Sequence, residues 1–120
     1  LDVPDLVRSL RSLMWRHVGI ERTGNELATA RRTLQFWSRH QARGEFRERN
    51  GWELQNQLTV ASLVAAGAEL RTASVGTHTR SDSSGPLDLH HHTCLRNAAA
   101  DARDEVVPPG AVPPRAGPLP

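Results

Sequence analysis

The sequence predicts an all-α fold, in which a three-helix, up-down-up bundle of the spectrin-repeat type is followed by an extended segment and a disordered tail. In residues 52–72, apolar residues recur at helical spacing and would cover most of the circumference of a helix. Two amphipathic helical patterns precede this stretch. After residue 73, Thr, Val and Gly replace the helix formers, and a stretch rich in Pro and Gly follows. We therefore divide the chain into a bundle (residues 1–73), an extended segment (74–97) and a disordered tail (98–120).

The first helix is expected over residues 4–17. Asp2 is the expected N-cap, because a short side-chain acceptor suits that position and Pro4 follows in the first turn. Gly19 is placed to end the helix. The apolar face consists of Leu6, Leu10 and Leu13.

The second helix is expected over residues 24–43, with Gly44 as its stop. Thr23 and Glu26 have the spacing of a capping box, in which Thr occupies the N-cap. The loops on both sides of this helix are short, which favours antiparallel neighbours. Its apolar face consists of Leu27, Ala30, Leu34 and Trp37.

The third helix organises the bundle, and Asn50 is its candidate N-cap. One apolar stripe consists of Leu54, Leu58, Ala61, Ala65 and Ala68, and a second of Val60, Leu63, Val64, Gly67 and Leu70. A helix with two such stripes is expected to be buried as the central member. The uninterrupted apolar core, residues 58–68, is shorter than the ~20 residues that a bilayer requires. Because only two helices cover it, we expect apolar surface left over for a partner.

Composition limits the possible partners and compartments. All 15 basic residues are Arg, and the net charge of +2 is too small to make a nucleic-acid surface the leading interpretation. The single cysteine, Cys94, cannot form an internal disulfide, which suits a reducing cytoplasm. No signal peptide or membrane span is recognisable. The chain begins on Leu1 beside a helix start, so we expect it to be a fragment of a longer protein.

The run His90, His91 and His92 is the most conspicuous candidate metal motif. Successive strand residues point to opposite faces, so at most His90 and His92 converge, and no spacing requires Cys94 as a further ligand. A polar strand against a partner surface is the better interpretation. We predict no metal, catalytic or cofactor-binding residues, because neither a nucleophile elbow nor a glycine-rich dinucleotide or phosphate motif is present.

The second helix also carries an arginine-rich face that could bind RNA. A nearby aromatic residue, Trp37, belongs to the core stripe, whereas the arginines lie on the solvent side as a bundle helix requires. We therefore keep a stand-alone RNA- or protein-interaction module as an alternative and expect no nucleic-acid partner. The arginines are Arg31, Arg32, Arg39 and Arg43.

Three stretches carry a family resemblance. Residues 11–22 (RSLMWRHVGIER) resemble the segment that opens the C-terminal helical domain of the L-aspartate oxidases, which belong to the succinate dehydrogenase/fumarate reductase flavoprotein family. Residues 53–61 resemble the central helix of that domain, and residues 70–82 the Arg-x-Glu-Ser-Arg-Gly-x-His-x-Arg-x-Asp run that follows it. Ala73 and Val75 replace the Glu and the second Arg of that run.

The resemblance implies a parent enzyme with an FAD-binding domain, a capping domain and this bundle. Such an enzyme oxidises L-aspartate to iminoaspartate in NAD biosynthesis, and its FAD-binding and catalytic residues lie upstream, so this fragment would hold no FAD itself. The implied partners are those upstream domains, against which the extended segment would pack. The matching residues are the candidate interdomain contacts: Ser74, Gly76, His78, Arg80 and Asp82. A succinate dehydrogenase or fumarate reductase flavoprotein subunit is the near alternative.

Overall fold

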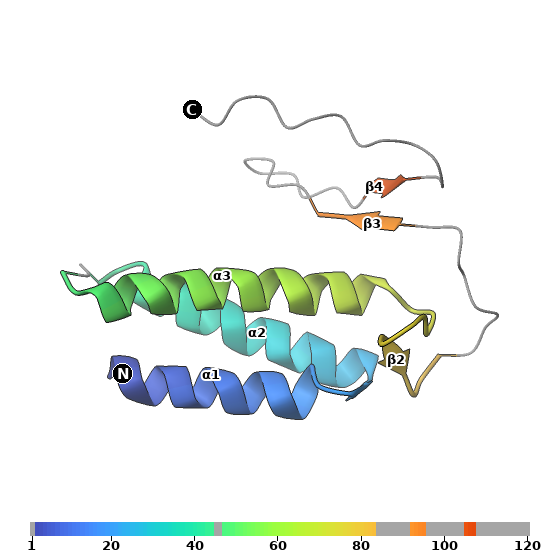
Figure 1. The fold of residues 1–120 in the computed structure, drawn as a ribbon, viewed down its shortest axis with the longest axis horizontal. Coiled ribbons are helices and arrows are strands. Elements are labelled where there is room, and N and C mark those ends of the chain that lie inside the picture. Colours follow the sequence, from blue (N-terminus) through green and yellow to red (C-terminus); the bar gives the residue numbers. More distant parts are fainter. Residues whose placement is uncertain (1, 45–46, 84–91, 96–104, 108–120) are drawn as a thin grey trace.

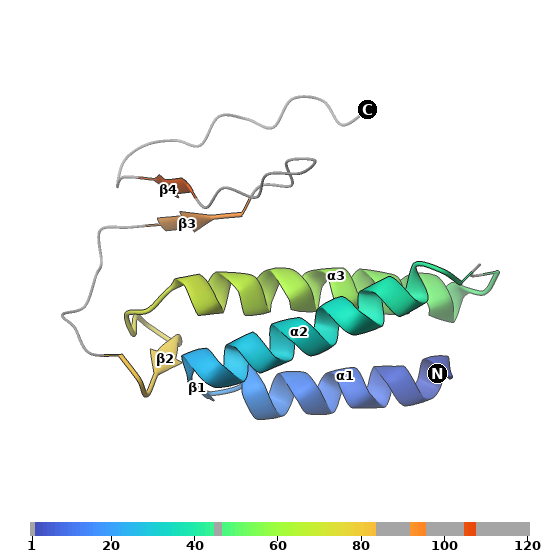
Figure 2. The same cartoon turned by 180° about the vertical axis from the view of Figure 1, so that it is seen from behind.

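The computed structural model describes residues 2–44, 47–83, 92–95 and 105–107 (Figure 1). The helices are α1 (Val3–His17), α2 (Gly24–Gln41) and α3 (Arg49–Leu70), and the strands are β1 (Glu21–Arg22), β2 (Thr79–Arg80), β3 (His92–Cys94) and β4 (Glu105–Val107). Each helix runs antiparallel to the one before it, as Figures 1 and 2 show from opposite sides. The predicted all-α, up-down-up three-helix bundle is confirmed.

The core lies between the three helices. Its buried residues are Leu6, Leu10 and Val18 from α1 and its end, Leu27, Ala30 and Leu34 from α2, and Leu54, Leu58, Ala61, Ala65 and Ala68 from α3. Trp37 packs against this cluster and is half-buried. The core stripes predicted for α2 and the first stripe of α3 are therefore confirmed. Replacing a fully buried Leu such as Leu27 or Leu54 by Ala would cost about 2–5 kcal/mol.

The first helix begins and ends close to the predicted residues. Asp2 occupies the N-cap position in an extended conformation, but its side chain makes no capping hydrogen bond. The helix ends at His17, and the Val18 N–H bonds to the Met14 carbonyl. Gly19 follows with no left-handed backbone; an added Cβ would lie 2.3 Å from the Trp15 carbonyl oxygen. Close approach to the helix end, rather than backbone conformation, therefore requires glycine at this position.

The second helix begins as predicted, because Thr23 Oγ1 accepts a hydrogen bond from the Glu26 N–H at 3.2 Å. It ends at Gln41, slightly before the predicted end. The prediction of Asn50 as the N-cap of α3 is wrong. Glu48 occupies that position, and its carbonyl accepts the Gly51 N–H, so the helix begins at Arg49 and Asn50 lies in the first turn.

The four strands form two small sheets. β1 pairs in parallel with β2, and β3 pairs antiparallel with β4. β3 lies beside α3 on the side away from α1 (Figure 1), and Leu95 approaches Gly67. β4 falls within the stretch predicted as a disordered tail; its two Val residues are β-branched and suit a strand. His90 and His91, and residues 98–104 and 108–120 of that tail, lie outside the described residues.

The second apolar stripe of α3 is not buried as a central helix would be. Val60, Leu63 and Val64 are 59, 52 and 43% exposed, respectively. The prediction of burial around most of the helix is therefore wrong for these residues, because α1 and α2 cover one side of α3. The expected leftover apolar surface is present. None of the helices in the described ranges combines the length and hydropathy needed to cross a bilayer.

Candidate functional site

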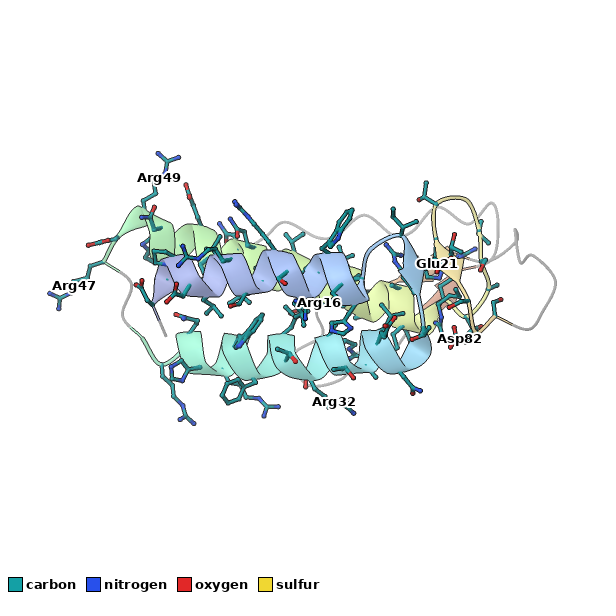
Figure 3. The ribbon with its side chains drawn as sticks, turned by 90° about the horizontal axis from the view of Figure 1, so that it is seen from below. Arg16, Glu21, Arg32, Arg47, Arg49 and Asp82 are labelled. Atoms are coloured by element: carbon teal, nitrogen blue, oxygen red, sulfur yellow. The ribbon has the colours of Figure 1, made fainter. Side chains whose placement is uncertain are left out.

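The chain that follows α3 folds back onto one end of the bundle. Val75 and His78 exchange two backbone hydrogen bonds, of 2.9 and 3.0 Å, around a two-residue turn. Gly76 occupies this turn with φ of +59°, a conformation that side chains disfavour. The turn directs the chain into β2, whose register places Thr79 opposite Glu21. Figure 3 shows Glu21 and Asp82 at the same end of the bundle, opposite Arg47 and Arg49.

Arg80 lies at the centre of this end and is only 8% exposed. Its Nη1 donates hydrogen bonds to the carbonyl oxygens of Ala68 at 3.3 Å, Glu69 at 3.1 Å and Arg71 at 3.2 Å. These carbonyls belong to the last turn of α3 and its C-cap, where acceptors have no partner within the helix. The last turn of α3 contains no basic residue of its own, so Arg80 supplies the positive charge that a helix C-terminus favours.

Asp82 connects Arg80 to the N-terminus of α2. Its carboxylate accepts Arg80 Nε at 2.8 Å and Arg80 Nη2 at 3.0 Å, a bidentate pair. The same carboxylate accepts the Gly24 N–H at 2.9 Å, at the first residue of α2. The Arg80 hydrogen bond, and then the Gly24 N–H, hold the pKa of Asp82 well below its usual range. The Asp82 hydrogen bond in turn raises the pKa of Arg80.

His78 bridges the ends of α1 and α3. Its Nε2 lies 2.8 Å from the Arg71 carbonyl oxygen, and its Nδ1 lies 2.8 Å from Arg22 Nη1. A carbonyl can only accept, so Nε2 carries the proton and Nδ1 accepts from the guanidinium. Arg22 Nε also donates to the carbonyls of Val18 and Gly19, at 3.2 Å each. Arg22 and Arg80 thus donate to carbonyl oxygens at the ends of two different helices, α1 and α3.

The structure therefore brings the five candidate residues together at one end of the bundle. Ser74 Oγ accepts the Arg80 N–H at 2.8 Å and donates to the Arg80 carbonyl at 3.2 Å, so four of the five side chains bond within the chain, while Gly76 forms the turn. We call Arg22, Ser74, His78, Arg80 and Asp82 the end cluster. Sequence reasoning missed Arg22, because its partner His78 is 56 residues away and no local pattern signals the pairing.

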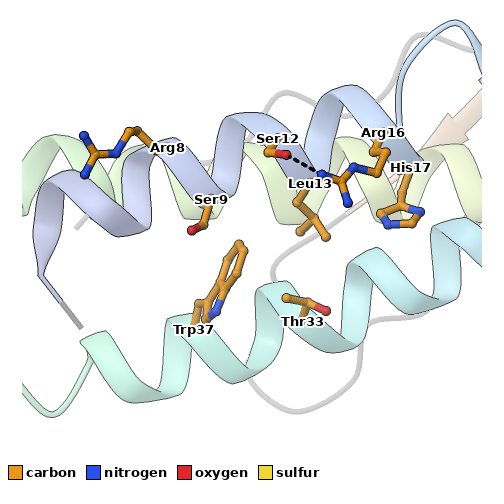
Figure 4. Close-up of a pocket in the computed structure, with 8 residues that line it drawn as sticks. All are labelled: Arg8, Ser9, Ser12, Leu13, Arg16, His17, Thr33 and Trp37. Carbon is orange, nitrogen blue, oxygen red and sulfur yellow. Dashed lines mark hydrogen bonds between the residues drawn. The ribbon is translucent and has the colours of Figure 1, made fainter.

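On the arginine-rich side of α2, Phe36 is 62% exposed and its ring stacks on that of His40, with the ring centroids 6.4 Å apart. Arg31 pairs with Glu69 of α3, whereas Arg32, Arg39 and Arg43 are exposed. Trp37 points toward α1 in Figure 4 and packs against the core. The arrangement is that of a solvated bundle face.

Among the described residues, surface grooves lie on both sides of α1, one against α2 and one against α3. The groove against α2 has a volume of about 400 Å³ and is lined about equally by polar and apolar surface (Figure 4); in it Arg16 donates to Ser12, and His17 Nδ1 is buried with no hydrogen-bond partner. The groove against α3 has a volume of about 480 Å³ and is mainly apolar. Across the described ranges, no three His, Cys, Asp or Glu side chains cluster as a metal site would require.

The residues present do not fit FAD as a ligand of this chain. The sequence has no glycine-rich turn between a strand and a helix to receive a pyrophosphate, and both grooves are shallow surface features. No chemical step is therefore assigned to these residues.

Comparison with known proteins agrees with the helical architecture. The chain is similar to a solved structure described as the Mycobacterium smegmatis Sdh1 complex in the apo form, with 30% identity and a TM-score of 0.71. The similarity covers 91% of this chain but 20% of that one, so the present chain spans about a fifth of its length. No curated protein sequence matches. Residues 7–108 match the family described as the fumarate reductase flavoprotein C-terminal domain, and the chain belongs to that family.

Proposed function

We propose that this chain is the C-terminal structural domain of an FAD-dependent oxidoreductase and that it packs against the flavin-binding and capping domains of the same polypeptide. The observation that carries the proposal is the exposed stripe of Val60, Leu63 and Val64 on α3. Family membership gives this surface a partner, because a flavoprotein C-terminal domain is by definition joined to a larger body. Burying the three side chains would contribute about 1 kcal/mol each, since each is roughly half exposed.

In this proposal the bundle supplies stability and shape, and FAD binding and catalysis belong to the upstream domains. The end cluster keeps the chain after α3 attached to the bundle, so that the exposed turn at Gly76 and Thr77 has a fixed position relative to α3. The extended segment, with Ser74, Gly76, His78, Arg80 and Asp82, would then contact the upstream domains through this turn. The cytoplasm is the proposed compartment.

For the reaction, we favour oxidation of L-aspartate to iminoaspartate, the first step of NAD biosynthesis. The sequence of residues 11–22, which resembles the start of the L-aspartate oxidase helical domain, supports this choice. The second candidate is a succinate dehydrogenase or fumarate reductase flavoprotein, which is supported by the similarity to the Sdh1 complex.

The test is expression of the complete reading frame, followed by a flavin absorbance spectrum and substrate assays. A yellow protein that consumes L-aspartate and forms iminoaspartate is expected. A yellow protein that oxidises succinate or reduces fumarate, without acting on L-aspartate, would select the second candidate. A colourless protein with no flavin after denaturation would overturn the proposed function altogether.

A further inference from the structure

The groove between α1 and α3 has the composition of a docking site. Its apolar floor is continuous with the exposed stripe of α3, because Val60 and Val64 belong to both. The volume of about 480 Å³ is large enough for one or two aliphatic or aromatic side chains. The lining residues are Leu10, Arg11 and Met14 from α1, and Asn56, Gln57, Val60, Ala61 and Val64 from α3.

The rim of this groove carries polar groups without partners. Within the described part of the chain, the Arg11 guanidinium makes no ion pair or hydrogen bond, and neither do the side chains of Asn56 and Gln57. The nearby acids on the same helices are already paired, since Asp5 binds Arg8 and Glu53 binds Arg49. An apolar centre, a polar rim and an arginine are typical of protein–protein interfaces.

We propose that this groove binds one segment of the upstream domains, which inserts an apolar side chain between α1 and α3 and presents a carboxylate to Arg11. The inference rests on the proposed function, because it names the chemistry of the partner surface. The groove is positively charged, since Arg11 is the one charged residue among those that line it, and this charge indicates an acidic partner.

The same charge argues against a second copy of this chain as the occupant. A twofold dimer that packed this groove against itself would bring two copies of the same lining together, and that lining holds Arg11 but no acid. Like charges at such a contact cost free energy, and neither groove would gain an acid. A neutral apolar partner would fill the floor but leave the guanidinium partly desolvated without compensation. A partner segment with an acidic residue beside an apolar side chain would pair with Arg11 and also fill the apolar floor of the groove.

The experiment uses the full-length flavoprotein with the photo-reactive residue benzoylphenylalanine in place of Gln57, at the rim. After irradiation and digestion, the cross-linked peptide is identified by mass spectrometry. We expect an upstream peptide that holds an apolar residue within a few positions of Asp or Glu. Arg11→Glu should lower the cross-link yield about threefold to tenfold. The matched control is Arg39→Glu, an exposed charge reversal on α2, which should leave the yield unchanged.

Cross-linking to a second copy, or no cross-link in a yellow and active protein, would overturn the docking inference while leaving the proposed function intact. An upstream cross-link whose yield does not respond to Arg11→Glu would overturn the acidic chemistry of the partner. Restoration of the yield, when the identified acid is changed to Arg in the Arg11→Glu background, would establish the pairing. A protein without flavin would refute the proposed function instead, as measured on the same samples by absorbance.

Discussion

Arg80→Met is the sharpest test of the end cluster. Met keeps a long apolar side chain but donates no hydrogen bonds, so the carbonyls of Ala68, Glu69 and Arg71 lose their shared charged donor. Because these three hydrogen bonds share one nitrogen, each is weaker than a separate charged hydrogen bond. We therefore expect the free energy of unfolding to fall by about 2–3 kcal/mol, which is less than the sum for three separate bonds. A bundle of about 70 residues has a total stability of roughly 4–10 kcal/mol, so the loss would be large.

The assay is urea unfolding of the 120-residue chain at neutral pH, followed by far-ultraviolet circular dichroism. Arg32→Met is the matched control, because Arg32 is exposed on α2 and should change stability by less than about 0.5 kcal/mol. If Arg80→Met behaves like Arg32→Met, the Arg80 contacts do not stabilise the bundle and the reasoning about the end of α3 fails.

Three further predictions concern the pH dependence of the cluster, a close contact and the exposed stripe. The native pKa of Asp82 is lowered, so its stabilising effect is complete above the unfolded pKa of about 4 and is lost as pH falls below it. The stability difference between the wild type and Asp82→Asn should therefore shrink from pH 5 to pH 2 in urea titrations, and a constant difference would contradict this. Gly19→Ala should lower the melting temperature by several degrees, because its Cβ would meet the Trp15 carbonyl at 2.3 Å; an unchanged melt would mean that the loop adjusts freely. The isolated chain leaves this stripe uncovered, so we expect it to self-associate nonspecifically in light scattering, and Val60→Ser/Leu63→Ser should reduce that self-association with a stability cost of no more than about 1 kcal/mol. Undiminished self-association would show that another surface is responsible.

The sequence predicts the helices well because their determinants are local. Apolar periodicity placed the buried residues of α2 and the first stripe of α3, and the spacing of Thr23 and Glu26 located the start of α2. The N-cap of α3 was missed because Asn50 has the better capping side chain, whereas the backbone bond from Gly51 to Glu48 adds a turn before it.

Contacts between distant segments were beyond sequence reasoning. Residues 74–82 were identified as a group from their family resemblance, but nothing in their spacing specifies the ends of α1, α2 and α3 as their partners. The Gly24 N–H meets Asp82 across 58 positions, and Arg22 meets His78 across 56. Periodicity also could not say which of the two apolar stripes of α3 would be covered, because both are equally apolar. That choice depends on where α1 and α2 pack.

The end cluster and the exposed stripe together bear on how the chain contacts its partner. The four polar candidates Ser74, His78, Arg80 and Asp82 use their side chains to satisfy helix ends and backbone groups of this chain, so a partner does not have to supply those hydrogen bonds. Ala73 and Val75, which replace charged residues of the family pattern, are half-buried and leave the Arg80–Asp82 pair intact. The polar interactions at this end therefore stabilise the bundle itself. Two parts of the surface remain without a partner: the exposed apolar stripe of α3 and the groove between α1 and α3, where Arg11 has no acidic partner among the described residues. Covering them with another protein surface would remove apolar area from water and so stabilise the complex.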